Sequence, residues 1–193
     1  MKKIFVGIIF LIFLSPVAVM ADYQEGRDAF DRGDHSTALK EFKNLAKQND
    51  PRGQYALAVM YDLGEGVLQN SKEALRYYRL AAEQGFADAQ NNLGVAYDQG
   101  EGVDTDYKEA MKWYLLAAER GNRDAPNNIG VLHMIGFGVP RSFLKAHTWF
   151  IIAGAGDSEA ISNKNFSKKK LTPEQLIESQ KRADEWRQIW LKK

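Results

Sequence analysis

One sequence pattern recurs every 36 residues along most of the chain. The recurring positions hold glycine or alanine, and they are Gly64, Gly100 and Gly136, then Gly66, Gly102 and Gly138, then Ala38, Ala74, Ala110 and Ala146. A fixed period in this range is the signature of a stacked repeat, in which each unit buries its apolar face only against its neighbours. The chain is therefore expected to fold as an array of similar units.

Each unit reads as a helical hairpin. In the central unit, residues 88–99 and residues 107–120 each place apolar or small side chains on one helical face. Gly100 is expected to end the first helix, because glycine adopts the left-handed conformation without steric cost. Gly102 is expected to be a second, more tolerant turn position, so Gly100→Val should cost more stability than Gly102→Ala.

Residues 57–94 and 93–130 resemble the Sel-1-like repeat, a relative of the tetratricopeptide repeat. The family pattern LGxxYxxGxGV, followed by WYxxAAxxG, is met by LGVAYDQGEGV and WYLLAAERG, and residues 129–156 match more loosely. The resemblance implies an all-α, right-handed α/α solenoid of Sel-1-like and tetratricopeptide-like hairpins, closed by a C-terminal capping helix. It is specific for fold and says little about function.

Residues 1–21 predict a secretory signal peptide. Lys2 and Lys3 precede an apolar run at 4–14, and small residues stand at Val19 and Ala21. We expect cleavage before Asp22 and a periplasmic or secreted protein; an uncleaved signal anchor is the alternative and the only expected membrane attachment. The chain has no cysteine, which excludes a lipoprotein anchor and disulfide bonds.

The remaining chain divides into three parts. Residues 22–50 form a tetratricopeptide-like first hairpin, because the Gly-x-Gly-Val loop is missing there, and residues 51–157 form three Sel-1-like repeats. Residues 158–193 form a degenerate repeat and the capping helix. Thr172 and Gln175 predict a capping box around Pro173 at the start of that last helix.

The charge balance argues against nucleic acid as a partner. The chain carries 26 basic and 25 acidic residues, and removal of residues 1–21 leaves 24 basic ones, for a formal charge of −1. This balance gives no electrostatic support for nucleic-acid binding. Basic side chains do cluster around Phe166, at Lys164, Lys168, Lys169 and Lys170. The cluster is either a solvated helix face or a contact for an anionic partner or membrane surface.

No residue pattern predicts catalysis or a cofactor. The three histidines lack metal-ligand spacing, so no metal is expected. Two Ser-x-x-Lys strings, Ser142–Lys145 and Ser167–Lys170, matter because cysteine-rich secreted relatives have been described as penicillin-binding or β-lactam-hydrolysing. No SDN or KTG sequence accompanies them. We predict no enzymatic activity; a cell-wall or β-lactam hydrolase is the alternative from a different class.

The predicted binding residues come from the geometry of tetratricopeptide-type stacks, whose first helices line a concave groove. Counting from the leucine of each LG pair gives five groove positions, Tyr55, Asp62, Asn91, Asp98 and Asn127. Asparagine can bond a bound backbone through both halves of its amide. A carboxylate in the last turn of a helix opposes the macrodipole. The aspartates therefore bond groups in their own Gly-x-Gly loops, select a basic partner, or do both.

These features predict a protein–protein interaction module, an adaptor or scaffold that binds a protein or peptide in its concave groove. No small-molecule substrate, nucleic acid or cofactor is expected. Some bacterial Sel-1-like proteins look like periplasmic immunity proteins, so neutralisation of a toxic enzyme is an alternative within the same class. Tight one-to-one binding to an enzyme would distinguish it from the adaptor role.

Overall fold

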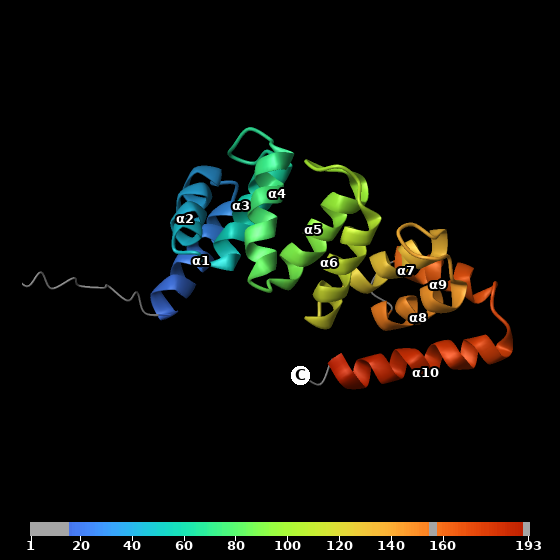
Figure 1. Cartoon of the computed structure of the whole chain (residues 1–193). Helices are drawn as coiled ribbons and strands as arrows, with labels where there is room; N and C mark the ends of the chain where they lie inside the picture. The colour runs from blue at the N-terminus through green and yellow to red at the C-terminus, as the bar shows by residue number, and fades with distance from the viewer. Residues whose placement is uncertain (1–15, 155–157, 191–193) are drawn as a thin grey trace, which may run out of the picture.

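The computed structural model describes residues 16–154 and 158–190, and all its regular structure in these residues is α-helical. The helices are α1 (Pro16–Asp31), α2 (His35–Lys47), α3 (Pro51–Leu63), α4 (Ser71–Glu83), α5 (Ala87–Gln99), α6 (Tyr107–Glu119), α7 (Ala125–Ile135), α8 (Phe143–Ala153), α9 (Ser158–Lys168) and α10 (Pro173–Trp190). Helices α1 to α9 follow one another in a row, and α10 runs back beneath α7 and α8 (Figure 1). The predicted all-α solenoid is confirmed.

The start of the chain was predicted to be a signal peptide. Residues 1–15 of that segment lie outside the described residues, and α1 begins at Pro16 and passes through the predicted cleavage point before Asp22. Among the residues that the structure describes, none of the helices combines the length and the apolar character that a membrane span requires.

The second helix of each hairpin begins at the same kind of N-cap. The Asn70 side chain accepts hydrogen bonds from the amides of Lys72 and Glu73, at 3.1 and 3.2 Å. Thirty-six residues later, Asp106 makes the same two bonds to the next hairpin. Side-chain oxygens at this position satisfy amides that the first helical turn leaves free. The repeat therefore encodes its helix starts as well as its core.

The two glycines of each Gly-x-Gly loop have different roles. Gly64, Gly100 and Gly136 end the first helices in the left-handed conformation, with φ of 76°, 79° and 86°, as predicted for Gly100. Gly102 also has a positive φ of 73°, but a Cβ there would lie 2.6 Å from the carbonyl oxygen of Ser71 in the preceding hairpin. Gly102 is thus a point of close contact between repeats, and the expectation that it tolerates alanine is not supported.

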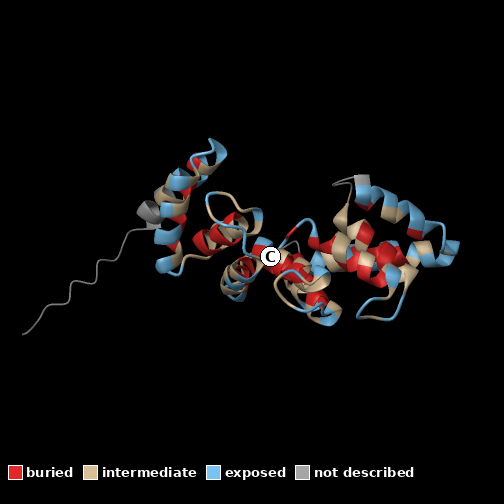
Figure 2. Ribbon diagram, turned by 90° about the horizontal axis from the view of Figure 1, so that it is seen from above, coloured by how far each residue is buried: buried red, intermediate tan, exposed pale blue. Residues whose placement is uncertain are grey.

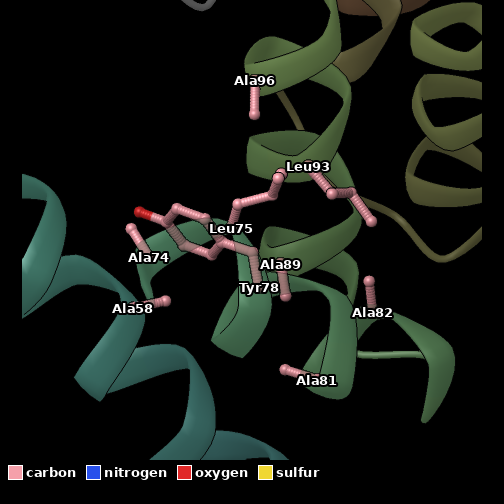
Figure 3. Packing of buried hydrophobic residues seen from close by; sticks show 9 residues of the cluster. All are labelled: Ala58, Ala74, Leu75, Tyr78, Ala81, Ala82, Ala89, Leu93 and Ala96. Atoms are coloured by element: carbon pink, nitrogen blue, oxygen red, sulfur yellow. The ribbon is translucent and has the colours of Figure 1, made fainter. Parts of the chain in front are cut away.

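Small residues set the spacing within the hairpins. In the central cluster, Tyr78 and Leu75 of α4 pack against Ala58 of α3 and Leu93 of α5 (Figure 3). A Cβ on Gly94 would lie 2.6 Å from the ring of Tyr114, so only glycine permits this approach of α5 to α6. Buried residues lie along the middle of the array, where neighbouring helices face one another, and exposed residues lie along its outside (Figure 2). Each hairpin is completed by its neighbours, as a stacked repeat requires.

The last two helices close the array against α8. The buried Ser167 of α9 donates to the Lys164 carbonyl at 2.9 Å and lies 3.1 Å from Nδ1 of His147 in α8. Helix α10 lies along α8, where Trp186 meets Trp149 with ring centroids 5.5 Å apart. Its N-terminus has the predicted capping box: the Thr172 amide donates to Gln175 at 3.1 Å, and the Gln175 amide donates to the Thr172 hydroxyl at 3.3 Å.

Candidate functional site on the first-helix face

Tyr55, the predicted aromatic anchor, lies half-buried on α3. Its ring centroid is 5.9 Å from that of Tyr78 and 5.0 Å from that of Phe86. Burial raises the pKa of the phenol, and the charge of Asp88 adds to this effect. We call the surface formed by the first helices of the hairpins, α1, α3, α5 and α7, the first-helix face. One part of the Tyr55 ring is packed into the hairpin, and the rest borders a pocket on this face.

The two predicted asparagines join neighbouring repeats. Asn91 is 7% exposed, accepts from Nδ2 of Asn128 at 3.1 Å and donates to Asn92 at 3.3 Å. Asn127 is half-buried and accepts from Nδ2 of Asn163 at 3.4 Å. The amide of Asn91 is therefore already used in a contact between α5 and α7. It is the adjacent Asn92 that borders a surface cavity.

The two predicted aspartates hold tyrosines of their own hairpins. The Tyr78 hydroxyl donates to Asp62 at 3.1 Å, and the Tyr114 hydroxyl donates to Asp98 at 3.2 Å. Burial raises the pKa of Asp98, while the bond from Tyr114 acts in the opposite direction. Burial and the neighbouring carboxylate raise the pKa of each tyrosine, so the hydroxyls stay protonated donors.

The third repeat shows why these aspartates are present. One period after Asp98 the chain carries Met134, and one period after Tyr114 it carries Phe150. When the second helix carries a tyrosine, the first helix carries an aspartate opposite it. When the second helix carries a phenylalanine, the first helix carries an apolar methionine. A buried hydroxyl without an acceptor costs about 1–3 kcal/mol. The aspartate's partner thus lies across the hairpin, on the second helix, rather than in the Gly-x-Gly loop.

A small apolar pocket opens on the first-helix face between α1 and α3. Its volume is about 120 Å³, and it is lined by Tyr23, Arg27, Phe30, Asp31, Phe42, Tyr55, Ala56 and Val59. Arg27 and Asp31 are exposed on its rim, and neither forms an ion pair with another described residue. An apolar floor with one basic and one acidic group at its edge suits an apolar side chain of a peptide whose backbone crosses the rim.

A second cavity lies one repeat further along, between α3, α4 and α5. Its volume is about 230 Å³, and its wall includes Asp62, Tyr78, Asn92, Val95 and Glu101. Asp62, Asn92 and Glu101 are the polar or charged members of this wall. The two hollows place the predicted Tyr55 and Asp62 on neighbouring sites of the same face, whereas Asn91 and Asp98 serve mainly the interior.

Counting along the repeats did not select Arg27, Phe30 or Asn92. Counting from an LG pair cannot align α1 with α3, because the first hairpin lacks the Gly-x-Gly-Val loop. Tyr23 and Asp31 of α1 nevertheless end up beside Tyr55 of α3. A search for aromatic residues near the start of each first helix could have found this cluster.

The Ser-x-x-Lys serines lie in structural positions. Ser142 accepts from the Lys145 amide at 3.3 Å and caps α8. Ser167 has no exposed surface, so its hydroxyl cannot meet a substrate. Among residues 16–154 and 158–190, no group of three or more His, Asp or Glu side chains could hold a metal ion.

A Sel1 repeat model matches three successive segments of the chain, residues 51–86, 87–122 and 124–158. The chain belongs to the Sel1 repeat family. The matched segments correspond to the hairpins α3–α4, α5–α6 and α7–α8. Proteins of this family generally act as non-catalytic modules for protein–protein interaction, which supports a protein partner in general terms.

Solved structures extend the likeness beyond the three repeats. A Sel1 repeat protein from Oxalobacter formigenes is 33% identical with a TM-score of 0.67, over 73% of this chain and 58% of that one. The protein c5321 of Escherichia coli, a protective antigen of uropathogenic strains with an SLR fold, is 28% identical with a TM-score of 0.61, over 89% of this chain and 46% of that one. The present chain thus spans about half the length of each.

A more distant likeness supports the fold alone. Cysteine-rich protein B of Helicobacter pylori is 22% identical with a TM-score of 0.52, over 67% of this chain and 93% of that one. The search of curated proteins finds no match.

Proposed function

We propose that this chain is a periplasmic or secreted adaptor that binds a protein or peptide segment on its first-helix face. The observation that carries the proposal is the apolar pocket between α1 and α3, with Tyr55 in its wall and the unpaired Arg27 and Asp31 on its rim. Such a pocket offers an apolar anchor site beside two charges that can orient a chain. Binding energy at interfaces concentrates in a few anchored side chains of this kind.

The second cavity supports an extended partner. Tyr55 borders the first hollow and Asp62 borders the second, and the two residues lie two turns apart on α3. A peptide that places one side chain in each hollow would cross the face of α3. Its basic groups could pair with Asp31 or Asp62, and its amides with Asn92.

The proposed location rests on the sequence of residues 1–21, with its two lysines, apolar run and small residues at the expected cleavage point. Mass spectrometry of the mature protein tests it. Export predicts an N-terminus at Asp22, whereas an intact Met1 in the membrane fraction would argue for the anchor.

The binding proposal is tested by reversing the two rim charges. Arg27→Glu combined with Asp31→Lys changes exposed side chains that form no ion pair with described residues, so helicity and melting should stay close to wild type. We expect affinity for the partner captured from a periplasmic extract to fall at least tenfold, about 1.4 kcal/mol. Lys72→Glu, on the outer side of α4, is the matched control. Equal affinity of all three proteins would place the site elsewhere.

The same titration separates the adaptor role from the immunity role. A partner that is an enzyme, inhibited with one-to-one stoichiometry, would favour the immunity alternative. No feature of the described residues favours it over the adaptor. For the hydrolase alternative, Ser167 is buried and Ser142 serves as the N-cap of α8.

A further inference from the structure

A separate cavity is lined by residues of α6, of the α7–α8 hairpin and of α10. Its volume is about 450 Å³, and its wall includes Leu115, His133, Lys145, Trp149, Arg182 and Trp186. None of these residues borders the pocket between α1 and α3. The Sel1 repeat match ends before α10, so the cavity depends on a helix that the repeats do not supply.

His133 is a buried polar side chain in this wall, and one of its two ring nitrogens lacks a partner in the part of the chain that the structure describes. Its side chain is only 9% exposed, and its buried Nδ1 has no hydrogen-bond partner among the described residues. Burial lowers the pKa of the imidazole, the charge of Lys145 lowers it further, and the Pro140 carbonyl acts in the opposite direction. The ring is therefore neutral at pH 7 and adds no charge to the wall, and its enclosed Nδ1 is not open to a ligand.

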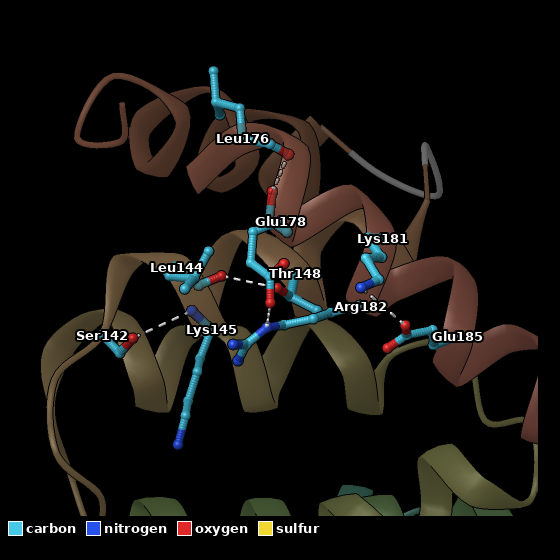
Figure 4. Close-up of polar contacts among 10 residues, drawn as sticks. Ser142, Leu144, Lys145, Thr148, Leu176, Glu178, Lys181, Arg182 and Glu185 are labelled. Carbon is cyan, nitrogen blue, oxygen red and sulfur yellow. Dashed lines mark hydrogen bonds and ion pairs between the residues drawn. The ribbon is translucent and has the colours of Figure 1, made fainter. Parts of the chain in front are cut away.

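The rim of the cavity carries an unbalanced positive charge. Lys145 is exposed and has no ion pair within the described chain, whereas Arg182 donates from Nε to Glu178 at 2.7 Å. The Thr148 hydroxyl is directed to the Leu144 carbonyl at 2.9 Å (Figure 4). Glu178 is neutralised by Arg182, so Lys145 is the cation left to meet an anionic group.

The rest of the wall is apolar and aromatic. Trp149 and Trp186 meet edge to face at 66°, and Leu115, Met111 and Ile152 complete the surface. Aromatic faces and edges of this kind favour a further ring or a large aliphatic group. The cavity thus offers a cation and an apolar, aromatic wall at the same place.

We propose that this cavity binds the C-terminal residue of a peptide or protein that ends in an aromatic or large apolar side chain. The free carboxylate pairs with Lys145, and the side chain packs against Trp149 and Trp186. The site is independent of the proposed groove between α1 and α3, and a partner could occupy either or both.

The test uses N-acetyl-L-phenylalanine as the probe and its C-terminal amide as the neutral control, titrated into the full chain and followed by the indole N–H signals in NMR spectra. We expect the acid to bind at least five times more tightly than the amide and to shift the signals of Trp149 and Trp186, leaving Trp113 unchanged. Lys145→Gln should remove the preference for the acid. The control Lys112→Gln, an exposed lysine of α6 paired with Glu109, should keep it.

A second variant keeps the test informative on its own. Trp186→Leu removes one aromatic wall but keeps Lys145, so it should weaken the acid and the amide by the same factor. Four outcomes would overturn the proposal: no binding of the acid at millimolar concentration, equal binding of acid and amide, unchanged preference in Lys145→Gln, or shifts confined to other tryptophans.

Discussion

The two central hairpins and the last hairpin reach the same backbone geometry with different side chains. In α3–α4 and α5–α6, an aspartate of the first helix accepts a hydrogen bond from a tyrosine of the second. In α7–α8, Met134 and Phe150 occupy these positions, and Phe150 is fully buried. The helices nevertheless end at glycines with nearly equal φ. Glycine and alanine thus keep the repeat geometry, and the polar pair can be replaced when both members change.

The regions also differ in what surrounds them. Helix α10 covers α8, and the two buried histidines, His133 and His147, both belong to the last hairpin. The central hairpins instead contribute α3 and its two hollows to the first-helix face. The comparison indicates that the last hairpin depends on a helix outside the repeats, whereas the central hairpins depend on one another.

Removal of α10 should have the largest effect and should act on the last hairpin. A chain that ends at Leu171 exposes Trp149 and the apolar surface around it, which promotes association. We expect a loss of at least about 3–5 kcal/mol, the range for one lost buried aromatic side chain. Differential scanning calorimetry should show aggregation or a separate early transition. The control is Ile177→Ser in α10. Ile177 is 73% exposed, so this variant should melt like wild type.

The close contact at Gly102 should distinguish it from a glycine that serves a turn alone. Gly102 and Gly121 both have left-handed φ values, 73° and 82°, but a Cβ on Gly121 would meet nothing within 4 Å. Both alanine variants carry the backbone strain of about 1–2 kcal/mol. Gly102→Ala should cost about 1–3 kcal/mol more, because it also pushes against the Ser71 backbone. Urea unfolding measures the difference, and equal costs would show that the repeats do not touch there.

The exchange of polar for apolar pairs can be tested in a double-mutant cycle. Asp98→Met leaves the Tyr114 hydroxyl buried without its acceptor and should cost about 1–3 kcal/mol. Adding Tyr114→Phe recreates the pair of the last hairpin and should recover most of that loss. Phe150→Tyr, which places a hydroxyl opposite Met134, should be destabilising in the same range. Additive effects of Asp98→Met and Tyr114→Phe in denaturant melts would mean that the two side chains are not coupled.

The smallest expected difference is in pH dependence. Burial lowers the pKa of His147 and of His133 in the folded state, so the unfolded chain binds more protons just below the ordinary histidine pKa of about 6.5. The stability that depends on these two histidines being neutral should therefore be complete above about pH 6.5. The free energy of unfolding should fall as the pH drops below that value. His147→Asn, which can still donate to Ser167, should reduce that fall between pH 7.5 and 5.5. An identical fall in the variant would exclude His147 as a cause.

The repeat period predicted the helices well because it reports packing. The central helices begin and end within one residue of the expected bounds, and Gly100 ends α5 as expected. The candidate site was harder to predict. Consecutive residues point about 100° apart around a helix, so a count that differs by one separates the buried Asn91 from the surface residue Asn92.

The aspartates show a second limit. The unfavourable position of Asp98 at a helix end correctly indicated that it needs a partner. The partner, Tyr114, lies 16 residues away on the facing helix. That pairing depends on how the two helices cross, which local sequence does not specify. The docking of α10 on α8 is set in the same way, by side chains that meet only after the array has formed.

Hydrogen-exchange mapping of the complex tests the central claim, that the first-helix face is the binding surface. The protein is compared alone and with its captured partner, and protection is read helix by helix. We expect added protection at residues 23–31 and 55–62, which border the two hollows, with the outer helix α6 unchanged. Protection confined to α4, α6 or α10, with α1 and α3 exchanging as in the free protein, would contradict the account.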